Sequence, residues 1–138
     1  MVASDKRKDN EMKLTLRQLV NGSEAMARLG GKGVKELTLK VFYNLSKNIG
    51  QIQPELVVYE KTRMSLFDSY SEEVGDVYGI PPSKQMAFNN EIESILSKVV
   101  EINVLPIHLT DEVIEKASIT ATELFLLEWM FILQEENK

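Results

Sequence analysis

The stretch VKELTLKVFYNLSKNIGQIQPELVVYEKTRMSLFDSY, residues 34–70, decides the fold that this sequence predicts. Its apolar residues recur at intervals of three and four, which is the period of one face of an α-helix. They are Val34, Leu37, Val41, Phe42, Leu45, Ile49, Ile52, Leu56, Tyr59, Met64, Phe67 and Tyr70. Because their phase is nearly preserved throughout, the spacing predicts helix over residues 34–70.

Gly50 and Pro54 interrupt this pattern. Pro54 has no amide hydrogen to donate to the carbonyl of Gly50, so an unbroken straight helix costs about 3 kcal/mol there. One long kinked helix and two helices meeting near residues 50–53 both remain open, and the preserved phase favours the kinked helix. The outer face carries charges of both signs, which is typical of a solvated surface. These residues are Lys35, Glu36, Lys40, Lys47, Glu55, Glu60, Lys61 and Arg63.

A second helix is predicted before this stretch, over about residues 15–29. Thr15 and Gln18 have the spacing of a capping box, in which each side chain binds the other's backbone amide. Two alternatives stay open: Asn21-Gly22 divides the helix with a turn, or a strand over 13–16 precedes a helix capped by Ser23. The following Gly-Gly-Lys-Gly at 30–33 lacks the spacing of a phosphate-binding P-loop, and we interpret it as a connection between helices.

The elements after residue 70 are shorter. Residues 71–83 are rich in loop-forming residues, with a possible short strand at Val77, Tyr78 and Ile80, and a helix is predicted over 83–99. Residues 101–109 contain β-branched residues and a proline, which indicates an extended segment, at most a short edge strand. Thr110 is expected to cap a brief helix from Asp111 to about Ala117. The fold class is therefore mainly α, a helical bundle built on the long helix or helix pair.

TELFLLEWMFILQ, residues 122–134, has nine apolar residues among the ten from Leu124 to Leu133, with Glu128 as the exception. A second capping box at Thr120 and Glu123 marks the start of its helix. Its ten-residue apolar core covers only about 15 Å as a helix, half of a hydrocarbon layer, so it is too short to span a membrane. We predict a helix with one face in the core, formed by Leu124, Leu127, Met130 and Phe131. A second side carries Phe125, Trp129 and Ile132. A helix that is apolar all round must be buried on more than one side. Either the domain itself covers this second side or another chain does, and in the second case these three residues are the candidate interface.

The bulk composition predicts one soluble domain over residues 13–138, preceded by a disordered charged tail over 1–12. The chain has 138 residues, 43% of them hydrophobic and 27% charged, with a formal net charge of −5 and no cysteine. The absence of cysteine excludes disulfides, thiolate metal sites and thiol nucleophiles. The N-terminal residues have no apolar segment of the kind that a secretory signal requires.

The sequence offers no catalytic, cofactor-binding or metal-binding residues. His108 is the only histidine, and we interpret it as a partly exposed strand residue. Carboxylate pairs such as Glu72-Glu73 and Asp111-Glu112 are adjacent in sequence, which does not place them on converging surfaces as acid–base catalysis requires. An enzyme with an unrecognised carboxylate site remains the less favoured alternative. A nucleic-acid-associated regulator is another, although the basic residues are mixed with acidic ones and the chain is acidic.

Four stretches carry a resemblance to a class of known proteins. They are KLTLRQLVNGSEAMARL, YEKTRMSLFDSY at the end of the long helix, PPSKQMAFNNEIESILSKVVEINVLPIHL, and ITATELFLLE. With these stretches the chain resembles small helical proteins, many of unknown function, that tailed bacteriophages and prophages encode. The shared residues are core and capping positions, so no catalytic residue is carried over. The resemblance implies an accessory or assembly-associated protein of the bacterial cytoplasm with protein partners. The hypothesis is therefore a non-enzymatic protein-interaction module, such as an assembly factor or adaptor.

Overall fold

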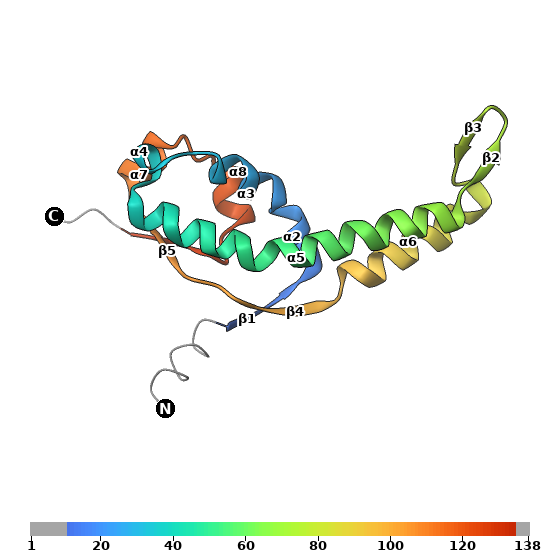
Figure 1. Ribbon diagram of the computed structural model, residues 1–138, viewed down its shortest axis with the longest axis horizontal. Helices are drawn as coiled ribbons and strands as arrows, with labels where there is room; N and C mark the ends of the chain where they lie inside the picture. Colours follow the sequence, from blue (N-terminus) through green and yellow to red (C-terminus); the bar gives the residue numbers. More distant parts are fainter. Residues whose placement is uncertain (1–10, 135–138) are drawn as a thin grey trace.

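The computed structural model describes residues 11–134 and is mainly helical, as predicted. One 32-residue helix, α5 (Leu39–Tyr70), runs through its length (Figure 1). The other helices are α2 (Leu16–Asn21), α3 (Ser23–Gly30), α4 (Val34–Leu37), α6 (Pro82–Leu96), α7 (Asp111–Lys116) and α8 (Ala121–Leu126). The strands are β1 (Glu11–Thr15), β2 (Glu72–Val74), β3 (Val77–Gly79), β4 (Val99–Asn103), β5 (Ile107–Leu109) and β6 (Phe131–Leu133).

The long helix is continuous through Pro54, so the alternative of two helices meeting near 50–53 is wrong. Burial explains why the helix persists, because Ile52 and Tyr59 anchor it in the core on either side of the proline. Helix begins at residue 34, as predicted, but the stretch is divided into α4 and α5, a break that the sequence did not predict. Thr38 divides them with a φ of 73°, a conformation outside the helical region, and its hydroxyl then accepts a hydrogen bond from the amide of Val41 at 3.5 Å.

The helix expected over residues 15–29 is two helices. The capping box is confirmed: the amide of Gln18 donates to the Thr15 hydroxyl at 3.2 Å, and the amide of Thr15 donates to the Gln18 carboxamide at 2.9 Å. The chain turns at Gly22, where an added Cβ would lie 2.8 Å from a methyl group of Leu127. A larger residue at this position would force the Leu127 side chain to shift, so glycine favours the close approach between the α2–α3 turn and the end of α8.

The described part of the chain begins with a strand of a small two-stranded sheet. β1 pairs antiparallel with β4, from Glu11 opposite Asn103 to Thr15 opposite Val99. Of the tail predicted over 1–12, residues 1–10 lie outside the described part of the chain, whereas Glu11 and Met12 belong to β1.

The extended segment predicted over 101–109 is confirmed as extended but forms two strands in different sheets. β4 pairs with β1, and it begins at Val99, which the predicted helix over 83–99 had included. β5 pairs with β6, and the proline at 106 lies in the connection between β4 and β5. A third sheet is the β2–β3 hairpin, which includes the strand expected at Val77 and Tyr78.

The apolar stretch near the C-terminus is only partly helical. The capping box at Thr120 and Glu123 is confirmed, but α8 ends at Leu126. A turn follows, and residues 131–133 form β6, parallel to β5 with Phe131 opposite Ile107. The prediction of one helix up to residue 134 is therefore wrong. A run that is apolar at nearly every position carries little periodicity, so it does not distinguish helix from strand.

One hydrophobic core joins elements from both ends of the chain. Its fully buried members include Leu19, Leu29, Leu37, Leu45, Ile52, Ile107, Leu109, Leu127 and Met130. Asn48 of α5 is also fully buried. Its carboxamide donates to the carbonyl of Leu105 at 2.9 Å and accepts from the amide of Leu105 at 2.8 Å. These bonds satisfy the backbone where the chain passes between β4 and β5.

The C-terminal third of α5 extends beyond this core. Beyond Tyr59 it continues beside α6, with the β2–β3 hairpin at the far end, as a two-helix projection (Figure 1). We call residues 60–95 the arm and the remaining described residues the body.

Candidate interaction surface

The three residues predicted as an interface, Phe125, Trp129 and Ile132, do not share one secondary-structure element. Phe125 lies in α8 and is 68% exposed, Trp129 lies in the turn after α8, and Ile132 lies in β6 and is 44% exposed. Trp129 is half-buried, and its indole donates to the carbonyl of Leu126 at 3.1 Å, which closes the turn. The indole therefore has a structural role in this part of the body.

Trp129 and Ile132 line a shallow, mainly apolar hollow of about 340 Å³. Its other lining residues are Met12, Val104, Pro106, Glu128, Met130 and Phe131. Phe125 does not line it. The structure thus brings two of the three predicted residues together and leaves the third on a separate part of the surface. On the predicted core side, Leu127 and Met130 are fully buried, and Leu124 and Phe131 are partly buried against the core.

A second hollow, of about 440 Å³, has His108 among its lining residues. As predicted, His108 is an exposed strand residue, in β5. Around it lie Glu36, Thr38, Lys40, Val41, Thr110, Glu112, Val113, Lys116 and Gln134. Several of these polar groups are engaged in helix capping. The Glu36 carboxylate accepts from the amide of Gly33 at 3.0 Å, and the Thr110 hydroxyl accepts from the amide of Val113 at 3.3 Å. Helix capping therefore explains the presence of Glu36 and Thr110 here, and no catalytic role is needed to explain them.

The strongest electrostatic contact of the body joins α3 to α8. Arg28 binds the carboxylate of Glu123 in a bidentate manner, with its Nη2 at 2.6 Å from Oε1, and the same Nη2 donates to the carbonyl of Ser118 at 2.8 Å. The guanidinium of Arg28 and the amide of Thr120 lower the pKa of Glu123 to about 2. The carboxylate thereby joins two helices and caps one of them, which is a stabilising role.

The arm has a thin interior made mostly of aromatic rings. Phe88 of α6 meets Phe67 and Tyr70 of α5 edge to face, with ring centroids 6.4 and 6.0 Å apart. The hydroxyl of Tyr70 donates to the carboxylate of Glu91 at 3.0 Å, and this hydrogen bond raises the pKa of Tyr70. Lys84 pairs with Glu72 at 2.5 Å and fastens the hairpin to α6.

This interior is too small to cover the apolar residues that the arm carries. Within α5, which is described throughout, no residue beyond Tyr59 is fully buried. Exposed apolar side chains instead extend from the middle of α5 to the hairpin and α6. They are Val57, Val58, Met64, Phe67, Val74, Val77, Tyr78 and Met86. An isolated two-helix projection has little apolar area to bury, so such a surface is typical of one that a partner covers.

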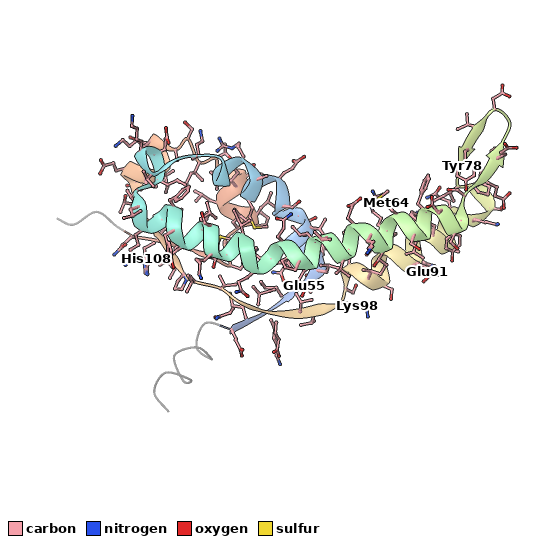
Figure 2. The ribbon with its side chains drawn as sticks, viewed as in Figure 1. Glu55, Met64, Tyr78, Glu91, Lys98 and His108 are labelled. Atoms are coloured by element: carbon pink, nitrogen blue, oxygen red, sulfur yellow. The ribbon has the colours of Figure 1, made fainter. Side chains whose placement is uncertain are left out.

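Sequence reasoning had placed Met64 on the apolar face of the long helix together with the core residues. The structure shows Met64 57% exposed, with its side chain on the side of α5 away from Glu91 of α6 (Figure 2). Periodicity identified an apolar stripe, but it does not show whether another element covers that stripe. The helical phase did indicate this exposure, because Met64 is displaced around the helix from the line through Ile52 and Tyr59.

Comparison with known protein families, with curated protein sequences and with solved structures finds no match to this chain. None of the helices in residues 11–134 has the length and apolar character needed to cross a membrane. The same residues contain no cluster of three or more acidic or histidine side chains able to hold a metal ion.

Proposed function

We propose that this protein is a non-enzymatic interaction module and that the arm is its binding element. The observation that carries the proposal is the exposed apolar side of α5 that carries Met64, which no element among residues 11–134 covers. Long amphipathic helices recognise partners through such faces, with apolar anchors at intervals of three and four. The shallow hollow beside Trp129 is a second, smaller apolar surface on the body.

The resemblance of the sequence to small helical phage and prophage proteins supports an accessory, adaptor or assembly role in the cytoplasm of a bacterial cell. Such roles require binding to other proteins and no catalysis. The helix-capping engagements around His108 support the non-enzymatic part of the proposal.

The test compares two variants of the full chain that place a charge on different sides of the arm. Met64→Asp alters the outer side of α5, and Met86→Asp alters α6, where the methionine is 75% exposed. Both residues are exposed, so neither change removes a core contact. Tagged protein is used to capture partners, including further copies of itself, from the cells that produce it.

We expect Met64→Asp to lose partners that the wild type and Met86→Asp retain, because a charge in an apolar interface must be desolvated. Circular dichroism verifies that each variant keeps the wild-type helix content. Capture and self-association that are the same for the wild type and Met64→Asp would refute the arm as the binding element.

A further inference from the structure

We propose that the partner of the arm is a second copy of this chain, bound so that α5 packs antiparallel against α5 of the other copy. The contact face is the row Val57, Lys61, Met64 and Asp68, which we call the outer seam. This inference rests on the proposed function and names the occupant of the same surface. Its basis is the order of apolar and charged residues along the seam.

The four residues form one stripe because they are spaced by four, three and four positions. All four are exposed, Val57 to 55%. At 3.6 residues per turn, Val57 and Met64 lie about 160° and 140° around α5 from Tyr59, which is buried in the core. Tyr70, which meets Phe88 of α6, lies within about 20° of Tyr59 around the same helix. The outer seam is therefore the side of α5 that α6 does not cover. Figure 2 shows Met64 on this side, towards which the β2–β3 hairpin also rises.

Within the described residues 11–134, the two charged residues of the seam have no ion-pair partner. The ion pairs among residues 11–134 join Arg17 to Glu93, Arg28 to Glu123, Arg63 to Glu60 and Lys84 to Glu72, and they leave Lys61 and Asp68 unpaired. Seven positions separate Lys61 from Asp68, about 10 Å along the helix, so they do not bind each other. Lys61 and Asp68, on either side of Met64, can therefore form ion pairs with a partner helix that carries an acidic residue opposite the lysine and a basic residue opposite the aspartate.

A second copy has that reverse order when it lies antiparallel. A two-fold axis between Met64 and Ser65 brings Lys61 of each copy opposite Asp68 of the other, which forms two ion pairs at once. Charged positions that flank an apolar seam form ion pairs between packed helices, and these pairs set the orientation of the two helices. A parallel pairing would instead place lysine beside lysine and aspartate beside aspartate. Charge complementarity therefore selects the antiparallel arrangement.

The ends of the seam also find counterparts in this arrangement. Val57 precedes Met64 by seven residues, and α5 ends six residues after Met64, at Tyr70. Val57 of one copy thus lies level with the end of α5 of the other, where the β2–β3 hairpin begins. That hairpin exposes Val77 and Tyr78. Val57, next to the base of one arm, and the apolar residues at the tip of the other arm are thus brought to the same place.

The test is a charge swap, with self-association measured by sedimentation equilibrium and light scattering. Lys61→Asp alone or Asp68→Lys alone places like charges opposite each other in the dimer. We expect each to raise the dimer dissociation constant about tenfold or more, and the double variant K61D/D68K to restore wild-type association. Lys47→Asp is the matched control, an exposed lysine of the same helix outside the seam, and should leave association unchanged.

A second measurement uses the absence of cysteine from the natural sequence. Met64→Cys, next to the two-fold axis, should be linked to its counterpart by a short bismaleimide, whereas Met86→Cys should not. Three results would overturn the pairing. The chain is a monomer at every concentration, the single charge reversals leave the dimer intact, or the double variant does not regain wild-type association. If the chain is monomeric but Met64→Asp still abolishes capture of another protein, the pairing is wrong and the arm remains an interaction element.

Discussion

Glu123 concentrates several stabilising contacts in one side chain. Its carboxylate binds Arg28 of α3 and accepts the amide of Thr120 at 3.0 Å, while its own amide donates to the Thr120 hydroxyl at 3.1 Å. The sequence predicted the two capping bonds from local spacing. The contact with Arg28 joins residues far apart in sequence, so only the tertiary structure reveals it.

This arrangement makes stability depend on pH. The pKa of Glu123 is lowered from 4.5 to about 2 on folding, so the stabilisation is present in full above about pH 4.5 and is lost as the pH falls towards 2. Because Arg28 is partly exposed, solvent screening limits the contribution to about 1–2 kcal/mol near neutral pH. We expect Glu123→Gln to lower stability by this amount at pH 7 and to reduce the loss between pH 4.5 and 2.

Urea unfolding followed by circular dichroism at several pH values checks this prediction. Glu24→Gln serves as the control, because Glu24 is an exposed carboxylate of α3. A Glu123→Gln variant with the same pH dependence as the wild type would contradict the assigned role of the carboxylate.

Asn48 shows what sequence patterns leave out at the residue scale. It occupies a core position of α5, in the series Val41, Leu45, Asn48 and Ile52, but because it is polar it does not belong to the apolar pattern of the sequence. Its spacing from its apolar neighbours was a signal that it is buried. A buried carboxamide needs partners, and the backbone of Leu105 supplies them. Only the fold shows that Leu105 is the residue whose backbone binds this carboxamide.

At the scale of elements, α5 is one continuous helix that contains a proline. Pro54 leaves the carbonyl of Gly50 without its helical hydrogen bond and places its ring against that turn. Packing of Ile52 and Tyr59 in the core offsets this cost. The sequence weighed one kinked helix against two helices, and the preserved apolar phase favoured the correct alternative.

Replacing Pro54 with alanine should therefore stabilise the protein. The variant restores the missing hydrogen bond on an exposed face of α5, and we expect the free energy of unfolding to rise by about 1–3 kcal/mol. Thermal and urea unfolding measure the change. Gln53→Ala, the neighbouring exposed position, should stay within about 0.5 kcal/mol of the wild type. Unchanged or lower stability of Pro54→Ala would show that the helix does not bear this cost.

At the scale of the whole molecule, charge distinguishes the proposed module from a nucleic-acid-binding protein. The chain carries a formal net charge of −5. Four lysines in the first half of the chain, Lys32, Lys35, Lys40 and Lys47, are divided by the break at Thr38. Lys40 shares a hollow with Glu36 and Glu112. These positions do not form the continuous basic face that phosphate binding requires.

We accordingly expect no binding to duplex DNA or to single-stranded RNA at low salt, where electrostatic attraction is strongest. Fluorescence anisotropy of labelled oligonucleotides tests this, with a basic DNA-binding protein as the positive control. Binding that weakens steeply with added salt would favour the regulator hypothesis over the interaction module.

The sequence by itself determined the helical class, the long central helix, the three capped helix starts at Thr15, Thr110 and Thr120, and the extended character of residues 101–109. These features depend on contacts within a few residues, which a local pattern records. The tertiary structure alone decided that residues 131–133 form a strand, because β5 supplies its hydrogen-bonding partner from a distant part of the chain. It also decided that Met64 is exposed, since an apolar stripe records which side of a helix is apolar but not whether another element covers it.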